Sequence, residues 1–432
     1  MKYKLPTQYK KRQCCIDVPI FITSMPYSKS YLIRVMGMMA LEGSVSSLRE
    51  WSPGLKGCDD VALMQQAVLT LLDGESDSIF VGASGAVWRF MIAIASLKTN
   101  RPIHFETSGR LAQRPILPLI NQLNKWGARI HWHKSDKGIE VTVFPAEKTL
   151  SGGVLDSEID RYTSQFRSAI MLIAPYLSES LTLSQPTEAL SGSYLALTQA
   201  LMCKAGGKIK EGNNGLIIQP SSYNAVTLRQ MLLYPERDWS AASYLFGWVA
   251  QEKGPTTLLL EGYKCGDLQG DKRIACDFFQ LGVVTTFGED GILLQRNREL
   301  PIASKLQFQL DECPDLAPAY LAALLGQHKQ FTLSGLARLA HKESDRFESL
   351  VGLAAAFGYK VTHDSDSLSF EGQWSMPKGQ IHIDPIGDHR IAMAATILTV
   401  ATERETIILE PEVVSKSFLS FYTIARQVGF TT

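Results

Sequence analysis

One kind of helix recurs six times along this sequence and constrains its fold more than any other feature. Each copy begins with a short polar or glycine-rich stretch and continues as an almost wholly apolar segment. The copies start about 50–80 residues apart, a spacing typical of repeated structural units. The six segments are SKSYLIRVMGMMAL from Ser28, GASGAVWRFMIAIASL from Gly82, TSQFRSAIMLIAPYL from Thr163, WSAASYLFGWVA from Trp239, PDLAPAYLAALLG from Pro314 and GDHRIAMAATILTVA from Gly387. Because they are apolar nearly all round, we expect these helices to be buried.

Each apolar helix is followed by an amphipathic one that ends at glycine. A single apolar stripe predicts a position nearer the surface, and a terminal glycine suits a left-handed C-cap. The six segments are CDDVALMQQAVLTLLDG, RPILPLINQLNKWGA, SGSYLALTQALMCKAGG, QGDKRIACDFFQLG, KESDRFESLVGLAAAFG and KSFLSFYTIARQVG. Runs such as IEVTVF, GLIIQP and GILLQR predict strands between the helices, and GNNG and GEDG predict turns. An ordinary α/β domain with helices alike by chance is the alternative, but six ordered pairs favour a repeat.

The composition predicts a cytoplasmic protein with two hydrophobic cores. The chain has 432 residues, of which 45% are hydrophobic and 20% charged, and its formal net charge is zero. This balance gives no reason to expect nucleic acid or an acidic membrane as a partner. No apolar run reaches spanning length, and the basic N-terminal stretch lacks the apolar core of a signal peptide. Seven cysteines without a CxxC pair indicate reduced thiols.

Polar and cationic residues gather where the apolar helices begin. Helix N-termini carry unpaired N–H groups and a positive partial charge, so they favour anions. The residues concerned are Ser28, Lys29, Ser30 and Arg34; Gly82, Gly85 and Arg89; Thr163, Ser164 and Gln165; Asp315; and Asp388, His389 and Arg390. Arg114, the run from Lys342 to Arg346, and Lys416 add charge at the amphipathic helices. Singly, each is more simply a cap or a surface charge. Together they predict a small ligand with several negative charges.

Seven short motifs occur in the order found in one enzyme family. They are SKSxxxR at 28–34, RP at 114–115, TSQF at 163–166, QGD at 269–271, KESDR at 342–346, DHR at 388–390 and KSF at 416–418. In this order the chain resembles 5-enolpyruvylshikimate 3-phosphate synthase, from about Ser28 to Phe418. Each motif is weak alone, but seven in register are specific.

The resemblance implies both a fold and a reaction. The fold is α/β, a two-domain inside-out α/β barrel with three βαββαβ-type repeats in each domain. Residues 1–24 and 238–432 would form the first domain and residues 25–237 the second, with crossings near Thr23–Pro26 and Pro235–Asp238. The enzyme would transfer the enolpyruvyl group of phosphoenolpyruvate to the 5-hydroxyl of shikimate 3-phosphate, releasing phosphate, by addition and elimination through a tetrahedral intermediate. It would act as a monomer in aromatic amino acid biosynthesis and would need no cofactor and no metal.

The matching motifs also imply site residues. The expected shikimate 3-phosphate ligands are Lys29, Ser30, Arg34, Thr163, Ser164, Gln165, Ser191, Asp315 and Lys342. The expected phosphoenolpyruvate ligands are Lys29, Gly85, Arg114, Gln165, Arg346, Arg390 and Lys416. Asp315 resembles the base near the 5-hydroxyl and Glu343 the acid for the methylene carbon, and Lys29 completes the catalytic set.

The sequence departs from the family pattern at several positions, where it carries an uncharged residue. Tyr27 replaces a glycine, Ala83 an asparagine and Ala86 a threonine, while Ala340 stands where arginine is frequent. Residues 191–194 read Ser-Gly-Ser-Tyr instead of Ser-Lys-Pro-Tyr. Losing one neutral hydrogen bond costs about 1 kcal/mol. These changes therefore predict altered affinity, and an altered response to the inhibitor glyphosate, but not loss of the chemistry.

Three other interpretations agree less well with the sequence. A transferase acting on UDP-N-acetylglucosamine shares the fold and donor, but it usually carries a reactive cysteine shortly before RP, and TSGRLAQRP has none. A non-catalytic relative that binds an anion would lose costly buried charges first, and here the charged motif residues remain. His131 and His133 share one face of a predicted strand. Because no third ligand lies nearby in the sequence, we expect them to be exposed histidines and not a metal site.

Overall fold

The computed structural model of the chain describes residues 2–5, 19–155, 159, 163–184, 192–212, 215–254, 256–300 and 303–430. The chain forms two compact units. Unit 1 comprises Met1–Tyr27, Pro53–Cys58 and Glu236–Thr432, and unit 2 comprises Ser28–Ser52 and Asp59–Pro235. None of the helices in the described part of the chain combines the length and apolar character that a bilayer crossing requires.

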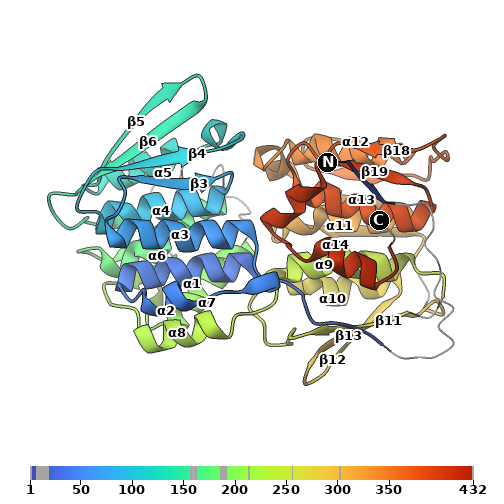
Figure 1. The fold of residues 1–432 in the computed structure, drawn as a ribbon, viewed down its shortest axis with the longest axis horizontal. Coiled ribbons are helices and arrows are strands. Elements are labelled where there is room, and N and C mark those ends of the chain that lie inside the picture. Colours follow the sequence, from blue (N-terminus) through green and yellow to red (C-terminus); the bar gives the residue numbers. More distant parts are fainter. Residues whose placement is uncertain are drawn as a thin grey trace. The chain divides into compact units, whose positions relative to one another are not determined.

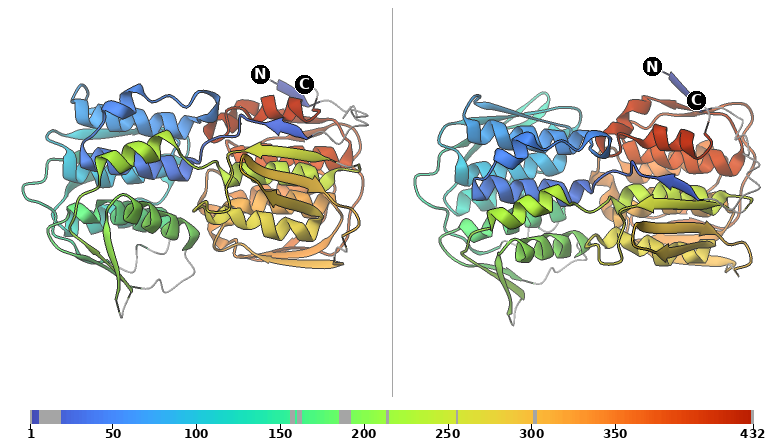
Figure 2. Two further views of the ribbon diagram at one scale, coloured as in Figure 1. Left: turned by 90° about the horizontal axis from the view of Figure 1, so that it is seen from below. Right: turned by 60° about the horizontal axis from the view of Figure 1, so that its bottom comes forward.

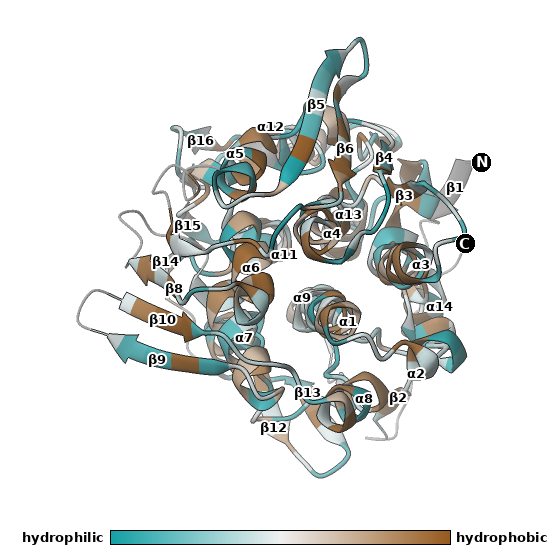
Figure 3. Cartoon of the chain, turned by 90° about the vertical axis from the view of Figure 1, so that its left-hand side faces the viewer, coloured by the Kyte–Doolittle hydropathy of each residue, from teal (hydrophilic) through white to brown (hydrophobic). Residues whose placement is uncertain are grey.

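Unit 2 is built around three buried helices. Nearly every residue of α1 (Lys29–Glu42), α4 (Gly85–Lys98) and α6 (Ser164–Ile173) is buried, as their apolar sequences predict. Figure 3 shows these three helices end-on, with the amphipathic helices further out. The outer helices are α2 (Ser46–Glu50), α3 (Asp59–Asp73), α5 (Leu117–Lys125), α7 (Gly192–Lys204) and α8 (Ala225–Leu233).

Two four-stranded sheets complete unit 2 and share one topology. In each, the first two strands are parallel and the other two join them antiparallel. One sheet has the order β3 (Ser78–Gly82), β4 (Ile103–Thr107), β6 (Gly138–Phe144), β5 (Arg129–Ser135). The other has the order β7 (Gly153–Val154), β8 (Leu181–Ser184), β10 (Gly215–Gln219), β9 (Lys208–Gly212). Each sheet takes its strands from a stretch of chain ordered strand, helix, strand, helix, strand, strand.

Unit 1 repeats this plan. Its buried helices are α9 (Trp239–Gln251), α11 (Ala317–Gly326) and α13 (His389–Thr402), and Figure 1 shows them running side by side. The partly exposed helices are α10 (Ile274–Asp277), α12 (Arg346–Ala356) and α14 (Phe421–Gln427). The sheets are β2 (Ile20–Ile22), β11 (Thr257–Glu261), β13 (Gly291–Arg296), β12 (Val283–Phe287); β14 (Lys305–Gln309), β15 (Gln330–Ser334), β17 (Leu368–Phe370), β16 (Thr362–His363); and β1 (Lys2–Leu5), β19 (Thr406–Leu409), β18 (Ile381–Ile383).

Strands far apart in the sequence pair in unit 1. β2 lies parallel to β11, more than 200 residues later, and Figure 2 shows the two side by side. β14 and β15 are likewise parallel, and β17 and β16 join them antiparallel. The same parallel-then-antiparallel order in the four four-stranded sheets confirms the predicted repeat for four of its six copies, and with it the α/β class. The copy that contains α13 has the three-stranded sheet, and the copy that contains α1 has no sheet of its own among the described strands.

The glycines expected to end the amphipathic helices do so. Each has a positive φ, the left-handed conformation that glycine adopts without a steric penalty. They are Gly74, Gly127, Gly206, Gly282, Gly358 and Gly429. The strand predictions for IEVTVF, GLIIQP and GILLQR are also confirmed, as β6, β10 and β13.

Four amphipathic helices begin or continue differently from the prediction. The helix expected from Arg114 begins at Leu117. Residues 270–281 form a 3₁₀ turn, the short helix α10 and a second 3₁₀ turn in place of one helix. In the first turn Lys272 donates to the Asp267 carbonyl, and Asp271 accepts from Ser240 on α9. The helix expected from Lys342 begins at Arg346, where the side chain of Asp345 caps it. The helix expected from Lys416 begins at Phe421, since Lys416 ends a 3₁₀ turn.

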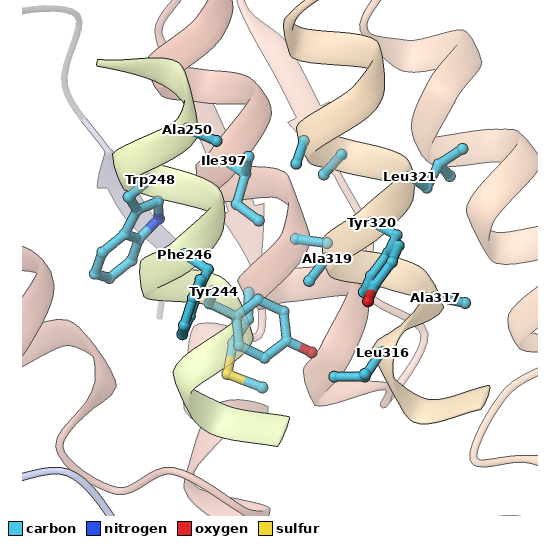
Figure 4. Packing of buried hydrophobic residues seen from close by; sticks show 14 of the residues in the cluster. Tyr244, Phe246, Trp248, Ala250, Leu316, Ala317, Ala319, Tyr320, Leu321 and Ile397 are labelled. Carbon is cyan, nitrogen blue, oxygen red and sulfur yellow. The ribbon is translucent and has the colours of Figure 1, made fainter. Parts of the chain in front are cut away.

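Close packing of α9 on α13 depends on one glycine. A Cβ on Gly247 would overlap the side chain of Ile397, with Cγ1 only 2.8 Å away. Figure 4 shows Ile397 beside α9 among the aromatic residues of that helix. Little space remains, because Ile397 is itself wholly buried.

We expect Gly247→Ala to destabilise the protein by about 1–3 kcal/mol, the usual cost of overpacking a buried site. Urea unfolding measures this cost. Ile397→Val should recover part of it in the double variant. Gly352→Ala is the matched control, because Gly352 lies in α12 with open space at its Cβ position. A Gly247→Ala variant as stable as the Gly352 control would contradict the packing argument.

Candidate active site

Arg346 is the centre of a buried ion-pair network in unit 1. Its side chain is 1% exposed, and its guanidinium donates in three directions. Nε lies 2.7 Å from Asp388 Oδ2, and Nη1 lies 2.8 Å from Asp315 Oδ1. Nη2 lies 2.5 Å from Glu343 Oε2. One arginine therefore holds three carboxylates from different parts of unit 1 in fixed positions.

Three further cations surround the carboxylates. Lys342 Nζ lies 3.1 Å from Asp315 Oδ1, and Arg390 Nη2 lies 3.1 Å from Asp315 Oδ2. Lys416 Nζ lies 3.4 Å from Glu343 Oε1. With Arg346, four cations face three carboxylates, so the network carries one positive charge in excess.

The network sets the ionisation of its members. Burial alone would raise the pKa of the Asp315 carboxyl, but Arg390, Lys342 and Arg346 together hold it well below its ordinary value. Burial would likewise lower the pKa of Arg346, but Asp388, Glu343 and Asp315 raise it. Burial does lower the pKa of Lys342, since the Asp315 carboxylate that opposes the effect is shared with two arginines. Asp315 is thus firmly ionised at neutral pH.

Helix starts place these groups together. Asp388 is the N-cap of α13 and accepts from the Arg390 amide at 3.0 Å, while Asp315 lies in the 3₁₀ turn that leads into α11. Arg346 opens α12, which Asp345 caps. Asp315, Arg346 and Arg390, which the sequence placed at helix starts suited to anions, therefore lie together in the structure. The prediction from sequence treated Asp388 only as a possible cap; the DHR motif was the signal that could have added it to the site.

Asp271, from the QGD motif, lies buried beside this network without an ion pair of its own among the described residues. It is 3% exposed and accepts from the Ser240 hydroxyl at the start of α9. Burial raises its pKa to about 6, although the Ser240 hydrogen bond opposes the shift. Nearby Asp315 raises it further.

We expect Asp271 to make stability fall with pH. Because its folded pKa of about 6 lies above the ordinary value of 3.8, its contribution is complete below pH 3.8 and is lost as pH rises through 6. Asp271→Asn should remove that loss, which amounts to at most ~3 kcal/mol for two pKa units. Urea unfolding at pH 5 and pH 7.5 compares the two proteins. If the free energy of unfolding changed by the same amount between pH 5 and pH 7.5 in the wild type and in Asp271→Asn, Asp271 would not titrate in this range.

Unit 2 presents a second cationic group around Gly85. A Cβ on Gly85 would lie 2.8 Å from Arg89 Nη1 and 2.9 Å from Arg114 Nη1, so both guanidinium groups lie against its backbone. Gly85 is the first residue of α4, where backbone amides are unpaired within the helix. Arg89 also donates from Nη1 to Gln165 Oε1 at 2.5 Å. Gly85, Arg114 and Gln165, predicted as phosphoenolpyruvate ligands, are thus neighbours.

The residues at the start of α1 lie in the same unit. Lys29 Nζ lies 3.0 Å from Asp60, which is buried. Arg34 is 4% exposed, and its hydrogen-bond partners in the described part of the chain are neutral groups, which include Thr198 Oγ1 at 2.7 Å and the Ser30 carbonyl at 2.8 Å. Burial lowers the pKa of Arg34 to about 10. Its charge has no carboxylate among the hydrogen-bond partners that the structure gives it, which suits a site for an anion.

The other predicted shikimate 3-phosphate ligands lie near α6 or outside the described residues. Thr163 is the N-cap of α6 and accepts from the Gln165 amide at 3.3 Å. Ser164 is the first residue of that helix. Arg34 Nη2 lies 3.3 Å from Ser168 on the same helix. Ser191 lies outside the described residues.

The predicted exposure of the two strand histidines is confirmed. His131 and His133 lie on β5 and are exposed. His133 Nε2 lies 3.4 Å from Glu140 on β6. Within the described ranges, no three or more His, Cys, Asp or Glu side chains are grouped as a metal site would require.

Comparisons with known proteins agree on one family. The family model described as EPSP synthase (3-phosphoshikimate 1-carboxyvinyltransferase) matches residues 55–424. The 3-phosphoshikimate 1-carboxyvinyltransferase of Bacteroides fragilis is 32% identical over 417 residues, which cover 94% of each chain. The protein of that name from Syntrophobacter fumaroxidans is 29% identical and covers 92% of this chain and 95% of its own.

Solved structures share the fold. An EPSP synthase from Acinetobacter baumannii superposes with a TM-score of 0.67 at 19% identity, covering 95% of this chain and 96% of its own. The enolpyruvyl transferase NikO from Streptomyces tendae gives a TM-score of 0.63 at 12% identity, covering 95% of both chains. The two-domain α/β fold predicted from the resemblance is therefore confirmed. With the family match over most of its length, the chain belongs to the EPSP synthase family, the 3-phosphoshikimate 1-carboxyvinyltransferases.

Proposed function

We propose that this protein transfers the enolpyruvyl group of phosphoenolpyruvate to the 5-hydroxyl of shikimate 3-phosphate and releases phosphate. The observation that carries the proposal is the Arg346 network. It holds two carboxylates suited to proton transfer, Asp315 and Glu343, among four cations suited to anionic substrates. Membership of the family supports the same reaction, which serves aromatic amino acid biosynthesis.

Each substrate carries a phosphate and a carboxylate, and the cations match them. Arg346 and Arg390 offer planar forks that can grip a carboxylate or phosphate by paired bonds, and Lys416 adds a compact charge. In unit 2, Gly85 and Arg114 offer backbone and guanidinium donors to the same donor substrate, phosphoenolpyruvate. Lys29 and Gln165 would touch both substrates. The remaining ligands of shikimate 3-phosphate are Ser30, Arg34, Thr163, Ser164, Ser191, Asp315 and Lys342.

The addition step needs one proton removed and one delivered. Asp315 accepts the proton of the 5-hydroxyl as that oxygen forms a bond to C2 of phosphoenolpyruvate. Glu343 gives a proton to C3, which becomes a methyl group. In the elimination step the bond from C2 to the phosphate oxygen breaks, the leaving phosphate takes up the proton held by Asp315, and the methyl group returns a proton to Glu343. The product then carries the enolpyruvyl ether.

The ion pairs of the free protein explain why substrates are needed to activate these carboxylates. Asp315 is a weak base while three cations hold its pKa well below the ordinary value. Substrate phosphates and carboxylates compete for the same cations, so their binding weakens the hold on both carboxylates. Anion binding would therefore make Asp315 a better base.

A phosphate-release assay with both substrates tests the proposal. We expect release only when shikimate 3-phosphate and phosphoenolpyruvate are present together. Release with UDP-N-acetylglucosamine in place of shikimate 3-phosphate would favour the sister transferase, and tight binding without release would favour a non-catalytic relative. We also propose that the protein acts as a cytoplasmic monomer; light scattering during size exclusion tests the monomer.

A further inference from the structure

Arg89 joins three segments of unit 2 from a buried position. It lies on α4, one turn after Gly85, and is 1% exposed. Nη1 donates to Gln165 Oε1 at 2.5 Å, and Nη2 donates to the Pro115 carbonyl at 3.1 Å. Its guanidinium carbon lies 5.2 Å from the centroid of the Phe166 ring, within the range of a cation–π contact.

The contact with Arg89 determines the orientation of the Gln165 side-chain amide. An amide side chain has an oxygen that accepts and a nitrogen that donates, and the two ends have nearly the same shape. Because a guanidinium only donates, Arg89 selects the oxygen. The Gln165 nitrogen must then point away from Arg89, free to donate to an anion.

The contact with Pro115 fixes the segment that carries Arg114. Pro115 directly follows Arg114, and its carbonyl is tied to the same guanidinium that orients Gln165. Arg89 and Arg114 both lie against Gly85. A shift of Arg89 would therefore move both the Gln165 amide and the segment that carries Arg114.

We propose that Arg89 is a positioning residue for the enolpyruvyl transfer, which turns the Gln165 amide nitrogen toward the substrates and holds Arg114 beside Gly85. This inference rests on the proposed contact of Gln165 with both substrates. Arg89 itself contributes no group to either substrate in this role.

Gln165→Glu gives the sharpest test of the orientation. The oxygen facing Arg89 stays, so the new carboxylate forms an ion pair and the variant should unfold at a temperature no lower than the wild type. The group facing the substrates changes from a donor to a negative oxygen. We expect KM for both substrates to rise by about 10- to 100-fold, as for loss of a hydrogen bond to a charged group.

Variants of Arg89 test the link between the two residues. Arg89→Met should raise KM for both substrates by about 3- to 10-fold with kcat within twofold, because the amide is no longer held in one orientation. Arg89→Lys keeps a donor for Gln165 and should recover part of that loss. In the Arg89→Met background, Gln165→Glu should lower the unfolding temperature, since the carboxylate has lost its partner.

A matched control separates positioning from general stability. Arg167→Lys changes another buried arginine, which donates to the Ser184 carbonyl, and should lower stability without changing either KM. Equal KM changes in the Arg167 and Arg89 variants would overturn the inference. So would unchanged KM values in Arg89→Lys and Arg89→Met while Gln165→Glu raises them, although Gln165 would then remain a ligand. The thermal comparison of the single and double variants needs no substrate, so it tests the Arg89–Gln165 contact even if phosphate release fails.

Discussion

Glu343→Gln is expected to lower turnover by about 10²- to 10⁴-fold, the usual contribution of a positioned general acid. Glutamine keeps the shape of the side chain but cannot give a proton to C3 of phosphoenolpyruvate. Glu343 Oε2 bonds to Arg346 and Oε1 lies 3.4 Å from Lys416, so the amide can still accept from one of these cations. The network should therefore persist, and the main loss should be in kcat.

Steady-state kinetics with each substrate varied in turn measure the effect. KM for shikimate 3-phosphate should change by less than about threefold, since removing an interaction of the transition state lowers kcat and leaves ground-state binding intact. Glu348→Gln is the matched control: Glu348 lies five residues along on α12 and is exposed. Equal losses of affinity and turnover in the Glu343 variant would contradict the proton-donor role.

The predictability of the fold follows from its repetition. Six apolar helices and six glycine-ended helices carry the same pattern, so burial and chain order follow from periodicity alone. Gly358 and Gly429 show this well, because each ends a helix whose first residues were wrongly placed. Local capping fixes helix starts: Asp345 accepts from the Glu348 amide and ends the loop that carries Glu343.

The site was predicted less completely, for a physical reason. The run HKESDRFE looks like a solvated helix face, since mixed charge is ordinary on a surface. In the structure Ser344 and Arg346 are 1% exposed. Nothing local reveals this, because the partners of Arg346 include Asp315 and Asp388, which are distant in sequence. Only the order of motifs along the whole chain identifies the run, and periodicity cannot show that Asp388 and Arg346 form an ion pair.

Arg346→Met is expected to destabilise the protein by about 3–5 kcal/mol at pH 7.5, because removing one partner leaves buried charge uncompensated. Methionine fills much of the volume but gives no hydrogen bond to Asp388, Asp315 or Glu343. Asp388 is wholly buried, so the loss of its ion pair with Arg346 should make the largest contribution to this destabilisation. Arg346→Lys should recover only part of the loss, since one ammonium cannot reproduce three directed bonds.

The pH dependence distinguishes this cause from lost packing. In the wild type the depressed pKa of Asp315 adds stability above its unfolded value, and this stability is lost as pH falls. Without Arg346 less of that stability exists to be lost, so the deficit of the variant should shrink as pH falls from 5 to 3, through the ordinary value of 3.8. A lost packing contact would cost the same at both pH values. Urea unfolding at each pH decides between them, and a pH-independent deficit would mean that Arg346 stabilises unit 1 through its volume and not through its charge.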